Sequence, residues 1–161
     1  MNKRGILTVI LLVGILIGTV YSDGRAEDLI LNVVDERSGI SHSFSFEEIS
    51  RYNHHSIDTT TPWTDGVSRF DGTLLKLFLL DVVSSFKTLV VTAYNDYSAE
   101  IKFTDLDASD VLLAWSLDGK QLRLEDKGPY WIVFDLDSLA PNDSKYLNKM
   151  VWQVKSINVV E

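Results

Sequence analysis

Three short segments of this sequence carry residue types suited to binding a flat, hydrogen-bonding ring. The first, Asn95-Asp96-Tyr97, joins an amide, a carboxylate and an aromatic ring at the end of an apolar run. An ionised carboxylate can accept two N–H bonds from an amidine-like ring edge, and charge-assisted bonds of this kind are strong. The same triplet also suits a hairpin turn, because Asn and Asp tolerate left-handed backbone and form Asx turns. The sequence leaves both interpretations open.

The second segment runs from Lys127 to Trp131 and places Gly128 and Pro129 ahead of two aromatic residues. Glycine permits close approach of the backbone to a ligand, and proline fixes the angle at which the chain enters a strand. In a strand, Tyr130 and Trp131 point to opposite faces, of which at least one belongs to the core. Each ring is therefore either part of the core or a platform on which a base-like ring stacks, a contact of about 1–3 kcal/mol.

The third segment contains Trp63 between Pro62 and Gly66, at the end of a polar stretch. The pattern predicts a loop over 51–65, and loops of that length in small domains are often functional. A tryptophan on such a loop either anchors the loop to the core or stacks on a ligand. Both roles remain open for Trp63.

No other pattern predicts a metal or catalytic site. His54 and His55 are adjacent, so in an extended segment they point apart, and no third ligand has suitable spacing. Asp105, Asp107 and Asp110 suggest a calcium loop, but the required glycine and the closing acidic residue are absent. The sequence also has no glycine-rich loop that would hold a phosphate.

The surrounding pattern predicts a single β-rich α+β domain that positions the three segments. An apolar run at 29–34 and alternation over 40–46 predict an opening hairpin. Ser45 followed by Glu48 is a capping-box pattern, which predicts a short helix over 46–52. The remaining strands are expected at 67–70, 89–94, 99–103, 111–117, 121–124, 130–134 and 151–160.

The main helix is expected to open at 71–73, because four apolar residues then follow with helical spacing. Thr104 is expected to cap a short helical turn, and 144–150 to form another. Asp118 and Gly119, between two strand patterns, are the strongest hairpin signal in the sequence.

Residues 1–26 have the pattern of a signal peptide. Lys3 and Arg4 precede an uncharged run over 6–20, and Gly24 and Ala26 supply the small residues of a cleavage site. The run is shorter than the roughly 20 apolar residues of a membrane span, which favours a cleaved signal peptide. An uncleaved membrane anchor is the alternative. Residues 27–161 are then an exported, periplasmic domain.

The chain is acidic and contains no cysteine. Its 23 acidic against 15 basic residues give a net charge of −8, which disfavours nucleic acid and anionic membrane surfaces as partners. An exported protein without cysteine has no disulfide, so packing alone must hold it together. The four Trp and seven Phe supply large side chains for that packing.

Taken in order, the motifs resemble the molybdopterin-binding fold of the sulfite oxidase family, over about 29–160. The matching motifs are Thr-Pro-Trp-Thr, Gly-Val-x-x-Phe-x-Gly-x-Leu-Leu, Asn-Asp-Tyr, Asp-Gly-Lys-x-Leu, Asp-Lys-Gly-Pro-x-Trp-Ile-Val and Trp-Gln-Val-Lys-x-Ile. The likeness is greatest to a short, exported, single-domain branch of that family.

The resemblance implies a pterin pocket without a metal. In enzymes of that family a cysteine before the first long helix ligates molybdenum, whereas this sequence has 59–65 there and no cysteine anywhere. The chain is therefore expected not to be an enzyme and to hold no metal cofactor. The implied ligand is a reduced pterin, and the implied site residues are Trp63, Asn95, Asp96, Tyr97, Lys127 and Trp131.

The resemblance also implies roles for these residues and for the protein. Asp96 would accept from the 2-amino-4-oxo edge of the pterin, Asn95 would pair with ring groups, and an aromatic residue would provide the stacking face. Cysteine-free exported members resemble sensors that act with membrane-bound cyclic-di-GMP regulators or sensor kinases. Two alternatives are a molybdenum-cofactor oxidoreductase subunit and an interaction domain that has lost ligand binding.

Overall fold

The computed structural model describes residues 29–139 and 144–161. The expected signal peptide, residues 1–26, lies outside the described residues. Among the residues that are described, no helix is long and apolar enough to cross a membrane.

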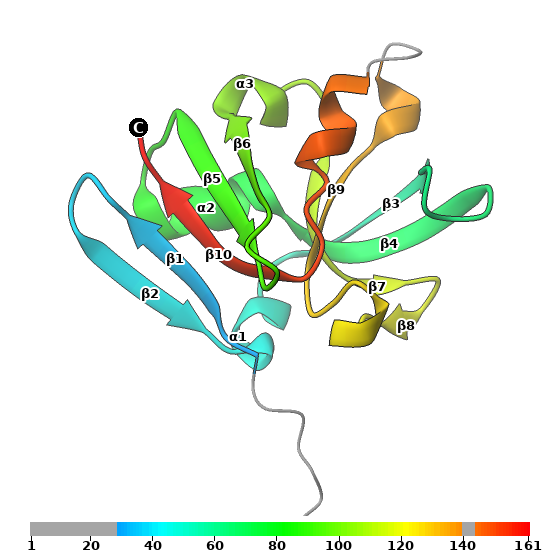
Figure 1. The fold of residues 1–161 in the computed structure, drawn as a ribbon, viewed down its shortest axis with the longest axis horizontal. Coiled ribbons are helices and arrows are strands. Elements are labelled where there is room, and N and C mark those ends of the chain that lie inside the picture. The colour runs from blue at the N-terminus through cyan, green and yellow to red at the C-terminus, as the bar shows by residue number, and fades with distance from the viewer. Residues whose placement is uncertain (1–28, 140–143) are drawn as a thin grey trace, which may run out of the picture.

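Two five-stranded sheets build the domain (Figure 1). The first sheet has the order β2-β1-β10-β5-β6, and only its β1–β10 pair is parallel. Its strands are β1 (Leu31–Asp35), β2 (Ile40–Phe44), β5 (Thr88–Ala93), β6 (Ser98–Lys102) and β10 (Val154–Val159). The first and last described strands therefore lie side by side.

The second sheet has the order β3-β4-β7-β8, and β9 also pairs with β7. All of its strand pairs are antiparallel. Its strands are β3 (His54–Thr60), β4 (Val67–Leu74), β7 (Val111–Leu117), β8 (Lys120–Gln121) and β9 (Trp131–Phe134). The short helices are α1 (Phe46–Ser50), α2 (Leu75–Val83), α3 (Phe103–Leu106), η1 (Leu124–Asp126), η2 (Leu136–Ser138) and η3 (Ser144–Lys149). The β-rich α+β class expected from the sequence is the observed one.

The capping box at the start of α1 is present as expected. The Ser45 hydroxyl accepts a hydrogen bond from the backbone N–H of Glu48 at 3.3 Å. The Glu48 carboxylate accepts from the backbone N–H of Ser45 at 2.8 Å, and this bond lowers the pKa of the Glu48 carboxyl. Two otherwise unpaired backbone donors are thus satisfied where the chain leaves β2.

The expected loop over 51–65 is wrong over 54–60, because His54–Thr60 forms β3 and pairs along its length with β4. Ile57 and Thr59 are buried, while Asp58 between them is exposed. Of these two buried residues only Ile57 is apolar. The sequence of β3 therefore does not show the alternation of apolar and polar residues that marks a strand.

Two expected helix starts are also wrong. The segment 71–73 continues β4 as far as Leu74, and α2 begins one residue later. Gly72 lies within β4, and a side chain does not fit at this position because an added Cβ would lie 2.3 Å from the carbonyl oxygen of Leu113 in β7. At α3 the capping contact comes from Asp105, whose carboxylate accepts from the backbone N–H of Lys102 at 2.8 Å, and not from Thr104.

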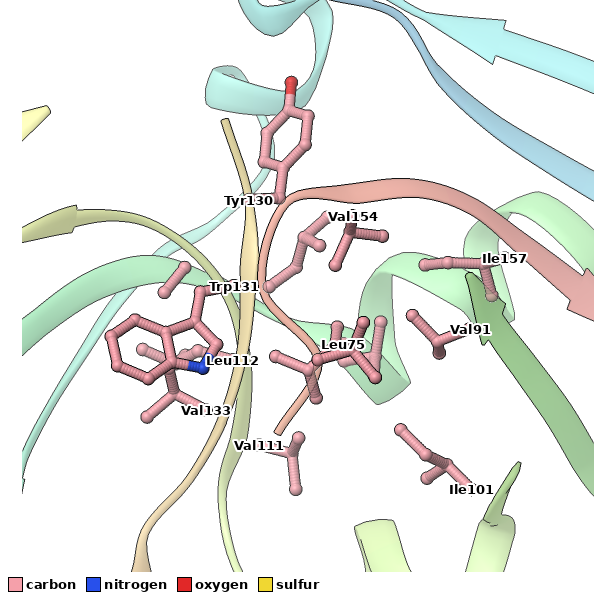
Figure 2. Close-up of a cluster of buried hydrophobic side chains, with 14 of the residues drawn as sticks. Leu75, Val91, Ile101, Val111, Leu112, Tyr130, Trp131, Val133, Val154 and Ile157 are labelled. Atoms are coloured by element: carbon pink, nitrogen blue, oxygen red, sulfur yellow. The ribbon is translucent and has the colours of Figure 1, made fainter. Parts of the chain in front are cut away.

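Side chains of both sheets and of α2 meet in one hydrophobic cluster (Figure 2). Every residue of β9 is fully buried, so both of its faces belong to the core. Figure 2 shows Tyr130 and Trp131 pointing in different directions from adjacent positions, as expected for extended backbone. The hydroxyl of Tyr130 is buried and has no hydrogen-bond partner within the described part of the chain.

Candidate ligand-binding pocket

A pocket of about 270 Å³ lies beside the end of β5. Its walls come from the loop after β3, from the β5–β6 turn, and from the segment that joins η3 to β10. The lining residues are Trp63, Ala93, Asn95, Tyr97, Leu147, Asn148, Met150, Val151 and Trp152. Segments far apart in the sequence thus converge, because β10 is the neighbour of β5 and brings Val154 opposite Ala93.

The triplet at 95–97 forms the β5–β6 turn. The backbone N–H of Asp96 donates to the carbonyl of Ala93 at 3.0 Å, and the N–H of Tyr97 donates to the side-chain oxygen of Asn95 at 3.1 Å. Asp96 has a φ of 64°, the left-handed conformation that Asp tolerates. The turn interpretation is therefore confirmed, and the same turn places Asn95 and Tyr97 in the pocket wall.

Tyr97 links two walls of the pocket. Its hydroxyl donates a hydrogen bond to the backbone carbonyl of Asn148 at 2.7 Å, and the side chain remains 48% exposed. One end of the ring is therefore anchored while a large part of its surface is free. An anchored aromatic face loses little conformational entropy when a planar ligand stacks on it.

Three tryptophans, Trp63, Trp131 and Trp152, form a cluster at the pocket. Their ring centroids are 5.3 Å apart for Trp63 and Trp152 and 6.0 Å apart for the other two pairs, all with edge-to-face geometry. Trp131 is fully buried, and its indole N–H donates to the carbonyl of Met150 at 3.2 Å. Trp131 therefore supports the two tryptophans that line the pocket and offers no free face of its own.

Two other expected site residues lie outside the lining. The Lys127 ammonium is 5.6 Å from the ring centroid of Trp131 and 5.9 Å from that of Trp152, so it packs beside the tryptophan cluster. The Asp96 side chain is 86% exposed, and its nearest ion-pair partner is Lys155 at 3.9 Å. Of the six residues expected from the sequence, Trp63, Asn95 and Tyr97 line the pocket, whereas Asp96, Lys127 and Trp131 do not.

The segment before β9 has a different role from the one expected. An added Cβ at Gly128 would lie 2.3 Å from the backbone carbonyl oxygen of Leu122. The glycine is thus required by close approach of two chain segments to each other. Its N–H donates to the carbonyl of Arg123 at 2.7 Å, which fixes the loop.

Sequence reasoning missed the wall formed by 147–152, including Asn148 and Trp152. Trp152 falls inside the strand expected over 151–160, whereas β10 begins at Val154, and the residue type alone carries no information about the strand beside it. A correct pairing of the last strand with β5 would have placed Val154 opposite Ala93 and so brought Trp152 to the same end of β5.

The lining contains no charged residue and combines aromatic and aliphatic surface with two side-chain amides. Such a site suits an uncharged planar ring with hydrogen-bonding edges. The residues do not fit molybdenum held through thiolate, because the chain has no cysteine. Within 29–139 and 144–161, no group of three or more His, Cys, Asp or Glu side chains is placed to hold a metal ion.

No protein-family model matches this chain, and no curated protein matches it. Among solved structures, it is similar to the sulfane dehydrogenase SoxCD from Paracoccus pantotrophus, with a TM-score of 0.59 and 16% sequence identity. The match covers 82% of this chain and 38% of that chain. At this identity the likeness concerns the fold alone.

Proposed function

We propose that this domain binds a pterin, or a planar heterocycle of the same kind, without turning it over. The observation that carries the proposal is the pocket whose walls combine Trp63, Tyr97 and Trp152 with the amides of Asn95 and Asn148. Aromatic faces bind a flat ring by stacking, and amides supply both donors and acceptors to its edges.

The size of the pocket supports a small ring. Its volume of about 270 Å³ is just below the 300–1,000 Å³ or so of sites for drug-sized ligands. A bicyclic heterocycle matches this space better than a larger cofactor does. The side-chain oxygen of Asn95 already accepts from Tyr97, so its NH₂ group is the part that would donate to a ring carbonyl.

The wider role rests on the sequence resemblance. In this proposal the domain is exported, has no catalytic activity, and reports pterin occupancy to the periplasmic part of a membrane-bound cyclic-di-GMP regulator or sensor kinase. Ligand binding would shift the partner's state by a difference in affinity between the occupied and the empty domain.

An anaerobic titration with reduced pterins tests the proposal. Tryptophan fluorescence is expected to be quenched in a saturable manner, because two of the four tryptophans line the pocket. Trp152→Leu should weaken binding by about 5- to 150-fold, which corresponds to the roughly 1–3 kcal/mol of one stacking contact. Asp96→Asn is the matched control, since its exposed side chain lies outside the lining, and it should bind as the parent does.

Other outcomes would separate the alternatives. Binding that is unchanged in Trp152→Leu would place the ligand elsewhere. No quenching by any reduced pterin would favour an interaction domain without a ligand.

The similarity to a sulfane dehydrogenase raises the alternative of an oxidoreductase subunit. Stoichiometric molybdenum in the purified protein would support that alternative and contradict the proposal.

A further inference from the structure

Strand β2 forms one edge of the first sheet, where it pairs with β1 alone (Figure 1). Its inward face carries Ile40, His42 and Phe44, opposite Asp35, Val33 and Leu31 of β1. Phe44 packs against Phe78 of α2, with ring centroids 5.3 Å apart. The apolar face nevertheless continues past the covered core, since Ile40 is 54% exposed.

This edge lacks the protection that sheet edges usually have. Exposed edge strands normally carry charged residues or proline, which prevent pairing with another chain. Among the other described strands whose ladder lies on one side only, β3, β6 and β8 contain Asp58, Glu100 and Lys120, respectively, whereas β9 has no charged residue and is fully buried. β2 contains neither proline nor any Asp, Glu, Lys or Arg.

The sequence of β2 reads alike in both directions. Ile40-Ser41-His42-Ser43-Phe44 has an apolar residue at each end, a serine next to each, and a single residue at the centre. Antiparallel pairing of two copies about His42 would place Ile40 opposite Phe44 and Ser41 opposite Ser43. A two-fold interface requires such self-complementarity.

We propose that two copies of this chain pair antiparallel through β2, with the two-fold axis at His42. The first sheet of one copy and the first sheet of the other then become one continuous sheet. The exposed Ile40 of each copy contacts the Phe44 side chain of the other. Cross-strand apolar pairs of this type stabilise antiparallel sheets.

The charges favour β2 over the rest of the surface as the place where two copies meet. The chain has a net charge of −8, so two copies repel each other over most of their surface. They meet here along a strip without acidic residues.

Dimer formation would leave both pockets open. Residues of β5 and of the β5–β6 turn line the pocket, and β5 is separated from β2 by β1 and β10. Each pocket therefore lies on the part of its sheet remote from the two-fold axis. The dimer is independent of whether the pocket binds a pterin.

Single cysteines test the register, because the chain contains none of its own. In His42→Cys the two cysteines face each other, with Cα atoms about 4.5–5.5 Å apart, a separation that permits a disulfide. In Ser41→Cys they lie diagonally, about 7–8 Å apart, at or beyond the usual limit. With oxygen and copper phenanthroline as the oxidant, His42→Cys should form a covalent dimer rapidly and Ser41→Cys should not.

Sedimentation of chains without cysteine provides a second test. The parent chain is expected to show a concentration-dependent monomer–dimer equilibrium. Ser41→Lys, which places a charge on the free edge, should be monomeric. Ser98→Lys adds the same charge to the opposite edge, on β6, and should dimerise as the parent does.

Either of two results would overturn the proposal. One is a parent chain that stays monomeric at all concentrations. The other is cross-linking that is equally fast for His42→Cys and Ser41→Cys, since random collisions would then explain it. Circular dichroism of each variant would establish that loss of the dimer is not loss of the fold.

Discussion

The hydroxyl of Tyr97 and the backbone carbonyl of Asn148 are joined by a 2.7 Å hydrogen bond across one side of the pocket. Tyr97 follows the β5–β6 turn, and Asn148 belongs to η3. The bond therefore connects two elements that are 51 residues apart in the sequence. Both elements contribute lining residues, so the bond fixes the distance between two walls.

Removing this bond should loosen the pocket without removing its aromatic surface. Tyr97→Phe is expected to lower the free energy of unfolding by about 0.5–1.5 kcal/mol, the net contribution of a typical hydrogen bond. Urea unfolding measures the change. If the hydroxyl contributed nothing, the unfolding midpoints of Tyr97→Phe and the parent would coincide.

Tyr130→Phe should stabilise the protein. The buried hydroxyl finds no partner among the described residues, and an unsatisfied buried polar group costs about 1–3 kcal/mol. Thermal unfolding near neutral pH is the measurement. A lower melting temperature for Tyr130→Phe would show that the hydroxyl has a partner in solution.

The same residue gives the protein an alkaline sensitivity. Burial raises the pKa of Tyr130 above its ordinary value of 10.0. Above pH 10 the hydroxyl ionises in the unfolded chain while it stays protonated in the folded one, so stability falls as the pH rises. Tyr130→Phe should show a smaller fall between neutral pH and strongly alkaline pH, measured by urea unfolding at each pH.

Asp35 should produce the corresponding effect in acid. Hydrogen bonds from Arg37 lower the pKa of this carboxyl from 3.8 to about 2. A carboxyl with a depressed pKa contributes stability that is complete above pH 3.8 and is lost as the pH falls towards 2. Asp35→Asn should flatten the stability profile in that window, and an unchanged profile would contradict the assignment.

Ser45→Ala should destabilise α1 by about 1 kcal/mol, because the capping hydroxyl is lost. Ser50→Ala in the same helix is the control. The Ser50 hydroxyl only donates to the carbonyl of Glu47, which is exposed, so its loss should have little effect. Equal destabilisation of both variants in urea would argue against a specific contribution from the cap.

Much of the fold was predictable because local signals agree with tertiary structure. The β-branched run before Asn95 is β5, and the Ser45–Glu48 box begins α1. β3 was not predictable in this way, because one of its buried residues is the polar Thr59. Its pairing with β4, and not its composition, makes it a strand. Gly72 reads as a helix start locally, although its role is set by the β7 backbone.

The candidate site was predictable only in part. Trp63, Asn95 and Tyr97 were identified from residue type, but the direction of Asp96 depends on a left-handed turn that points it into solvent. Trp152 joins the site through strand pairing, which no local pattern reveals.

The position of β10 between β1 and β5 has a consequence for synthesis of the chain. Translation proceeds from the N-terminus, so the β1–β2 hairpin has no neighbour in its sheet until residues 154–159 have left the ribosome. Leu31 and Val33 are fully buried in the finished domain, and the pairing of their strand with β10 cannot form until then. The native state is therefore reached after translation of the last strand, and not stepwise during it.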